Sequence, residues 1–409
     1  MASEPPTVNC AGLDGFKSFE DYAALLRTRT SFNSTLLGQC QLPICQALWG
    51  FGEPDLSGIG AATGYTLSFS IGTLLFPLLT TISSRLGPTS RTVITSGMSS
   101  FFESATYFAL AIQVATIATL APKDLETKTT SFGDYEITIA GVVSALSLLP
   151  SIPPIILLAS IKEPRVIRAR RSYRLTIFAV TVAPFTYIFF EQCIRNFGPS
   201  QIGEGQGEGG KTLISGAEWA AITDLCFGGV EYVTGNEDYI LSVFQLMGSL
   251  FVFLFIIGFS VPAILQQVRD VYGEGNAVEQ KVGGWVERGA EVCRLRAVRG
   301  VLLSLPCFLS VPLLWGFWRL RDLQGQLAAS MGVDYEGNEW SFGQVMAITV
   351  FVPVGAEMIF AATRKRLDAE RVEEGVQLES QQQNIELSVG SHEKDEKYET
   401  RRRNATYPA

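Results

Sequence analysis

Histidine is almost absent from this chain, and its absence argues against several kinds of membrane enzyme. The one histidine, His392, lies in a polar C-terminal segment beyond every long apolar run. Haem held between helices, histidine-box di-iron centres and histidine-based zinc catalysis all need imidazoles inside or beside the membrane spans. We therefore expect a protein that is not an enzyme and that binds no metal ion or cofactor.

An excess of positive charge and a cleavable signal peptide are also lacking. The formal net charge is −8, with 40 acidic and 32 basic side chains, which gives no support for a nucleic-acid partner. The N-terminus has neither the basic region nor the apolar core of a signal peptide. We expect the first strongly apolar run to direct the chain to the membrane.

Apolar residues make up 47% of the sequence and gather in runs long enough to cross a bilayer. Seven such runs cover residues 58–82, 93–120, 137–160, 175–190, 239–265, 300–318 and 342–362. They predict an all-α membrane protein, a seven-transmembrane helix bundle over residues 57–362, with the lipid bilayer as its main partner. Residues 1–56 form an N-terminal region, and the charged, glutamine-rich residues 363–409 are expected to be disordered.

The loop over residues 161–174 predicts the orientation of the bundle. It carries one acid, Glu163, and six basic residues: Lys162, Arg165, Arg168, Arg170, Arg171 and Arg174. Basic loops are retained on the cytoplasmic side. The loop over residues 266–299 and the start of the tail are also basic, so we expect the N-terminus outside and the C-terminus in the cytoplasm. The basic loops are candidate sites for a cytoplasmic partner.

Five of the seven cysteines fall outside in this orientation: Cys10, Cys40, Cys45, Cys193 and Cys226. The outer side of the plasma or secretory membrane is oxidising, so we expect two disulfides and one leftover thiol, with the pairing left open. Unpaired structural thiols are the alternative. The sequon Asn33-Ser34-Thr35 lies on the same side, and Asn33 is a candidate glycosylation site.

Two glutamates lie inside predicted spans, Glu103 in the second and Glu357 in the seventh. An ionisable side chain there costs about 2.5–3.5 kcal/mol or more, and by default it marks a functional site. Both lie in the predicted cytoplasmic half, so they can share a cavity, and Tyr107 and Gln113 continue the polar face of the second span. One interpretation is a proton or cation site; the other is two protonated glutamates that hydrogen-bond neighbouring helices.

Small residues form a stripe along the first span. Gly60, Gly64, Ser68 and Gly72 recur every four residues and therefore share one face of a helix. Such stripes let helices approach closely. The stripe indicates either packing inside the bundle or an oligomer contact through the first span.

The prolines and a glycine-rich loop carry two weaker patterns. Pro150, Pro153 and Pro154 are dense enough to break or kink the third span. Residues 205–212 match the G-x-x-x-x-G-K-T pattern of a phosphate-binding loop. That loop needs a strand before it and a helix after it, whereas here a glycine-rich linker precedes it, so nucleotide binding is not expected.

Residues 40–60 carry a cysteine pair followed by the pattern G-x-G-x-P-D-x-x-G-I-G at the entry to the first span. This segment resembles a group of fungal multipass membrane proteins; the resemblance implies the membrane fold and brings no substrate or catalytic residues. The seven-span layout also resembles G-protein-coupled receptors. However, the third span has no D-R-Y and the seventh no N-P-x-x-Y, and layout does not imply function.

Two functions are compatible with these features. A large, disulfide-bonded outer face and basic inner loops favour a receptor-like sensor at the cell surface. The intramembrane glutamates and the prolines favour a proton- or cation-coupled transporter. The sequence places the sensor slightly ahead.

Overall fold

The computed structural model describes Cys10 and residues 27–28, 31–32, 34–50, 52, 54–83, 87–121, 134–159, 177–178, 180–181, 183–194, 216–228, 235–272, 296–338, 340 and 342–367. Nearly all of these residues are helical. The exceptions include the two-residue strands β1 (Arg27–Thr28) and β2 (Ser31–Phe32), which pair antiparallel before the first helix of the bundle.

Six helices of the described chain are long and apolar enough to cross a membrane. They cover Pro54–Ile82, Thr89–Leu120, Tyr135–Leu158, Tyr239–Gly258, Arg299–Ser330 and Gln344–Leu367. The prediction of a helical protein with several helices that are long and apolar enough to cross a membrane is therefore confirmed. The seventh span and the orientation stay predictions. The run at 175–190, expected to be the fourth span, lies partly outside the described residues, and the chain is helical over residues 183–194.

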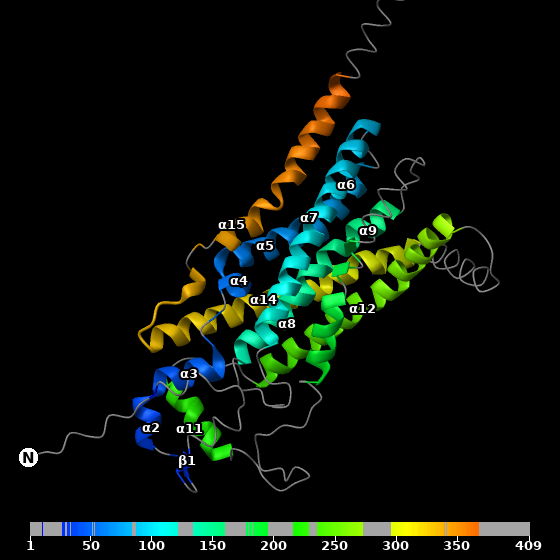
Figure 1. The fold of residues 1–409 in the computed structure, drawn as a ribbon. Coiled ribbons are helices and arrows are strands. Elements are labelled where there is room, and N and C mark those ends of the chain that lie inside the picture. The colour runs from blue at the N-terminus through cyan, green and yellow to red at the C-terminus, as the bar shows by residue number, and fades with distance from the viewer. Residues whose placement is uncertain are drawn as a thin grey trace, which may run out of the picture.

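The third predicted span is the centre of the bundle. It comprises α8 (Asp134–Leu148), the 3-10 turn η3 (Leu149–Ser151) and α9 (Ile152–Ala159). In its most apolar stretch 94% of the residues are buried, against 50% or less in each of the other five spans. It packs against α7 (Pro88–Leu120), α12 (Gly235–Tyr272) and α14 (Arg296–Ser330). Figure 1 shows these helices running alongside one another.

Two spans are irregular where they meet near the centre of the bundle. The first span comprises α5 (Ile59–Phe69), the π-helical segment η2 (Ser70–Leu75) and α6 (Phe76–Ser83). In η3 the Ile152 N–H bonds to Leu149 O, three residues back, because Pro153 has no N–H for that carbonyl. η2 and η3 are in contact. The proline-rich stretch thus tightens the third span into a 3-10 turn.

The small-residue stripe is used inside the bundle. A Cβ on Gly60 would overlap Gln344, one on Gly64 would lie 3.1 Å from Phe108, and one on Gly72 would overlap Pro150 O. These neighbours belong to three other segments of this chain. Packing inside the bundle therefore accounts for the stripe, and a second copy would have to displace these contacts.

A cap of short helices lies at one end of the bundle, where Figure 1 shows α2, α3 and α11 together. The helices are α2 (Ser34–Gln39), α3 (Gln41–Trp49), α4 (Pro54–Ser57) and α11 (Gly216–Phe227). Disulfides join Cys10 to Cys40 and Cys45 to Cys226, and Cys193 is free. The expectation of two bridges with one thiol left over is confirmed.

Several predicted features lie outside the described residues. These are Asn33, the loop over residues 161–174, the glycine-rich residues 205–212, most of the loop over residues 266–299 and the tail from residue 368 onward. Glycosylation, the orientation of the bundle and the disorder of the tail therefore stay predictions.

Candidate functional site: an acidic groove between two helices

The structure brings Glu103 and Glu357 to one cavity. The last span begins with α15 (Phe342–Thr349) and continues as a helix over residues 352–367. This second helix and α7 enclose a cavity of about 390 Å³, which we call the acidic groove. Its described lining residues are Ser96, Ser99, Ser100, Glu103, Pro353, Ala356, Glu357 and Phe360. Each helix supplies positions three or four residues apart, which share a helix face.

Close packing holds the two walls of the groove together. The Ser96 hydroxyl donates a 2.8 Å hydrogen bond to Glu357 Oε1. The next residue, Gly97, lets Met358 approach so closely that a Cβ on Gly97 would lie 2.5 Å from Met358 Cγ. Toward the middle of α7, Phe351 stacks on Phe101 with ring centroids 5.9 Å apart. The position of Glu357 is therefore set by contacts of its own helix with α7.

The last span is interrupted next to the groove. α15 ends at Thr349, and Phe351 and Val354 donate to carbonyls three residues back, Ile348 O and Phe351 O, each at 3.1 Å. Pro353 has no N–H to donate to Thr349 O, so the regular ladder cannot continue through this point. Pro353 lies one turn before Glu357, and the structure has a turn at residues 350–351, just before this proline.

The other two residues of the predicted polar site lie elsewhere. Gln113 is fully buried; its Nε2 donates to Ser144 O at 2.9 Å and to Ser147 Oγ at 3.1 Å. Its Oε1 accepts from Ser144 Oγ at 2.7 Å. Tyr107 is 47% exposed and does not line the groove. Gln113 thus joins α7 to α8, and of the four predicted residues the groove contains the two glutamates.

A polar cluster at the capped end was missed by the sequence analysis. Arg321 Nε donates to Ser57 O at 2.9 Å, and its Nη2 donates to Asn338 Oδ1 at 2.8 Å. The Tyr335 hydroxyl lies 3.3 Å from both Ser57 Oγ and Gln324 Oε1. Burial raises the pKa of the Tyr335 phenol above its usual value, although the Ser57 hydrogen bond and the Arg321 charge oppose the rise. Tyr335 therefore stays neutral at physiological pH.

Close contacts with Tyr335 and Gln344 account for glycines of the entry pattern. Gly50 and Gly52 have φ of 73° and 97°, which favours glycine, and a Cβ on Gly52 would lie 2.8 Å from the Tyr335 ring. Gln344 accepts from Gly60 N–H at 3.1 Å and donates to Pro54 O at 3.2 Å. The pattern therefore packs the chain entry against α15 and the segment that precedes it.

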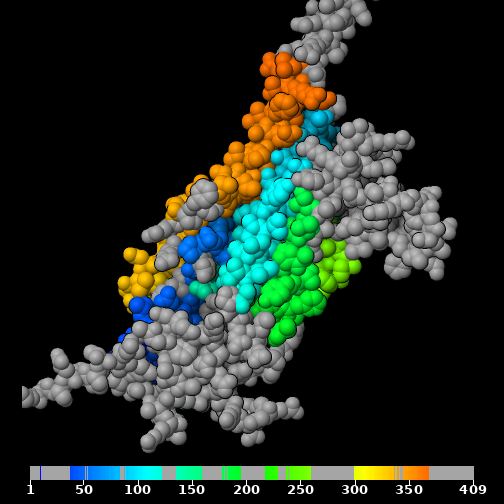
Figure 2. Space-filling model, viewed as in Figure 1, coloured from blue at the N-terminus to red at the C-terminus, as the bar shows by residue number. Residues whose placement is uncertain are grey.

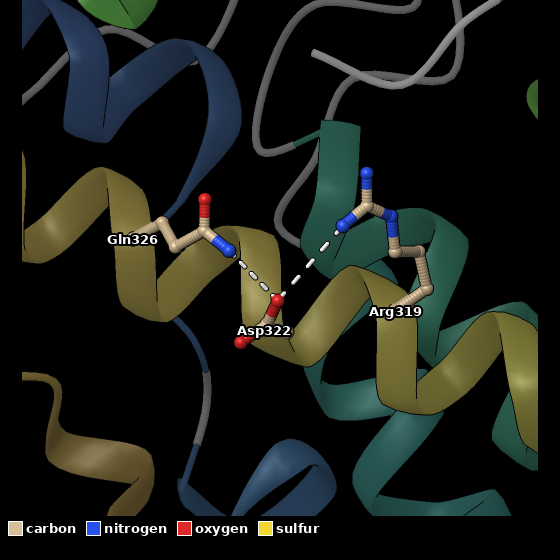
Figure 3. A network of polar contacts seen from close by, with 3 residues as sticks. All are labelled: Arg319, Asp322 and Gln326. Atoms are coloured by element: carbon tan, nitrogen blue, oxygen red, sulfur yellow. Dashed lines mark hydrogen bonds and ion pairs between the residues drawn. The ribbon is translucent and has the colours of Figure 1, made fainter. Parts of the chain in front are cut away.

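An exposed polar network lies on α14 near this cluster. Figure 3 shows Arg319 and Gln326 converging on Asp322. Gln326 Nε2 donates to Asp322 Oδ2 at 2.7 Å, and Arg319 Nη1 lies 3.9 Å from the same oxygen. Exposed pairs of this kind contribute about 0–1 kcal/mol, so we regard the network as a surface feature of the helix.

No protein-family model, curated protein or solved structure matches this chain. The class of protein therefore rests on the fold and the groove alone. Together they are consistent with a polytopic helical membrane protein in which two carboxyl groups line one cavity between two candidate spans. Carboxylate and hydroxyl oxygens are ligands for protons and hard cations, which is the chemistry that this arrangement can perform.

Proposed function

We propose that this protein is a proton- or cation-coupled transporter in which Glu103 and Glu357 form the coupling site. The observation that supports this most directly is that both acids line one cavity. The sequence placed a receptor-like sensor first, and the shared cavity reverses that order.

The size of the cavity favours a site over a structural contact. A glutamate that only joins two helices is protonated and packed against its partner. The acidic groove has a volume of about 390 Å³, room for roughly 13 waters at about 30 Å³ each. Water can hydrate a carboxylate and so lower the cost of ionising it inside the membrane.

The interrupted spans support the same function. Discontinuous helices line binding sites in many transporters. Here the last span breaks at residues 350–351, immediately before the groove, and the first and third spans carry π and 3-10 segments. A break lets the helix over residues 352–367 move against α7 without unfolding the rest of its span.

Reconstitution of the full chain into liposomes tests the proposal. With a pH-sensitive dye inside, an imposed Na⁺, K⁺ or organic-cation gradient is expected to drive proton movement above the rate in protein-free liposomes. Glu103→Gln and Glu357→Gln should each reduce this proton movement about tenfold or more. Each variant removes an ionisable group inside a span, and such groups usually mark functional sites. Glu237→Gln, at the start of α12 and outside the groove, is the matched control. Wild-type rates equal to those of empty liposomes under every gradient would reject the transporter.

A receptor-like sensor is the second candidate, and the outer cap favours it. Cys45–Cys226 joins α3 to α11, and Trp49 packs between Trp219 and Phe227 with ring centroids 5.6 and 4.9 Å away. A covalently braced cap suits ligand recognition outside the cell. Flux in liposomes that hold no partner protein would count against this candidate.

We propose the plasma or secretory membrane as the location, with the cap outside. Two disulfides at the capped end need an oxidising compartment. Glycosidase treatment should remove a glycan from the wild-type chain and so increase its electrophoretic mobility. The mobility of an Asn33→Gln variant should stay unchanged. A glycan attached at Asn404 instead would reverse the orientation.

A further inference from the structure

The acidic groove has no third helical wall among the described residues. Every described lining residue belongs to α7 or to the helix over residues 352–367. Figure 2 shows this last helix lying along α7 at the edge of the bundle. A cavity between two helices at the edge of a bundle opens sideways, toward whatever surrounds the bundle.

The surroundings of the opening are apolar. On the last helix Val352, Ile359 and Phe360 are 64%, 69% and 61% exposed. All three lie within the candidate span Gln344–Leu367. Apolar side chains that are exposed along a membrane span face lipid. Side chains that face the acyl chains therefore flank the opening of the groove.

The lining of the groove separates polar from apolar groups. α7 contributes three serines and Glu103, whereas the last helix contributes Pro353, Ala356 and Phe360 around Glu357. Carboxylates beside lipid need a positive charge or a proton to be stable there. The Phe360 ring offers an apolar contact and a face for a cation. A ligand that matches both parts is positively charged at one end and apolar at the other.

The volume argues against a bare ion as the sole occupant. At about 390 Å³ the cavity falls within the range of about 300–1,000 Å³ for small-molecule sites. A proton shared by two carboxyl groups or a dehydrated alkali ion needs far less room.

We propose that the acidic groove takes its substrate from the membrane and that this substrate is an amphiphilic organic cation, an ammonium group on a single apolar chain. This inference rests on the proposed function, because it assigns the substrate class of the same coupling site. The ammonium lies between Glu103 and Glu357, and the chain leaves over Phe360 into the lipid. Binding of the ammonium displaces the proton that the carboxyl pair holds, so cation and proton move in opposite directions.

The test compares three probes that separate charge from chain. Dodecyltrimethylammonium has both, tetramethylammonium has the charge alone and dodecanol has the chain alone. The permanent charge prevents the passive leak that a neutral amine would cause. With the full chain in liposomes and a pH-sensitive dye inside, a gradient of the first probe, applied below its solubilising concentration, should drive proton movement. The other two should give the rate of protein-free liposomes.

Two neighbouring residues provide a matched pair of variants. Phe360 lines the groove and Ile359 does not, although both are exposed apolar residues of one helix turn. Phe360→Ala should raise the half-saturating concentration of dodecyltrimethylammonium about two- to fivefold, because the apolar chain loses its contact with the ring. Ile359→Ala should leave that concentration unchanged. Glu103→Gln and Glu357→Gln should each reduce the response about tenfold or more, with elution as a single size-exclusion peak as the check on folding.

The outcomes separate this inference from the proposed function. If tetramethylammonium, Na⁺ or K⁺ drives as much proton movement as the long-chain probe, the substrate class is wrong while the transporter stands. If the long-chain probe works but neither Phe360→Ala nor the glutamine variants change the response, the groove is not its site. If no cation drives proton movement, both proposals fail. Efficient cross-linking between copies through Ala356→Cys would assign the opening to a second copy and overturn the inference.

Discussion

One helix, α7, carries polar side chains in two very different settings. Gln113 is fully buried between α7 and α8, where its amide makes three hydrogen bonds to Ser144 and Ser147. Glu103, three turns earlier, lines a cavity of about 390 Å³ with Glu357. A polar residue in a membrane span is thus not by itself a functional site. Space beside an ionisable group is what distinguishes the groove from the sealed contact.

The largest effect should come from removing both charges of the groove. In a Glu103→Gln/Glu357→Gln variant we expect coupled proton movement to fall about a hundredfold, since each carboxylate supplies a charge-assisted interaction. The free energy of unfolding should stay equal to that of the wild type or rise, because two ionisable groups leave the membrane interior. Parallel liposome flux and thermal unfolding in detergent measure the two effects. A large loss of stability with little loss of flux would place the glutamates with Gln113 as structural groups.

The sealed contact should respond in the opposite way. Gln113→Leu leaves the Ser144 hydroxyl without its acceptor, and we expect the free energy of unfolding to fall by about 1–2 kcal/mol. Flux per folded molecule should not change. Val114→Leu, on the neighbouring exposed position, is the control and should alter neither quantity. Loss of flux in the folded Gln113→Leu protein would mean that the transport path extends into the core. Gln113 and the groove would then no longer differ in function.

The sequence predicted the groove better than it predicted the sealed contact. Depth along a helix is simple arithmetic at about 1.5 Å per residue, so Glu103 and Glu357 could be assigned to one level. The rotation of each position about the helix axis is a second signal. Gln113 lies ten residues after Glu103, which at about 100° per residue turns it roughly 80° away from the same face. That signal was in the sequence and would have separated Gln113 from the pair.

The polar cluster at the capped end could not be predicted in the same way. Arg321 and Ser57 are 264 residues apart, and no periodicity links a side chain on α14 to a carbonyl at the start of the first span. The glycines of the entry pattern indicate an unusual backbone conformation. The residues that contact this segment, Tyr335 and Gln344, depend on how three distant helices assemble. Apolar runs predict spans because every segment inside lipid must satisfy its backbone polar groups internally. Side-chain partners depend instead on how the helices pack.

A smaller effect is expected where the groove walls meet. Gly97→Ala places a Cβ against Met358, and we expect about 1 kcal/mol of lost stability, the lower end for overpacking because methionine adapts. The last helix should also shift from α7, which weakens cation binding severalfold. Gly355→Ala, with open space at its Cβ position, is the matched control. Equal behaviour of the two variants would mean that the close approach at Gly97 does not shape the groove.

The smallest effect is expected at Tyr107. This residue tests whether closeness to Glu103 along the helix matters for function when the side chain does not line the groove. Tyr107 lies one turn after Glu103, but it is 47% exposed and is not a lining residue. Tyr107→Phe should change the unfolding free energy by no more than about 0.5 kcal/mol and should leave flux and its dependence on cation concentration unchanged. If the variant loses flux while Ile359→Ala does not, the functional surface of α7 continues past the groove toward the capped end. The contrast with Gln113 would then be one of degree, with a polar path between the two settings.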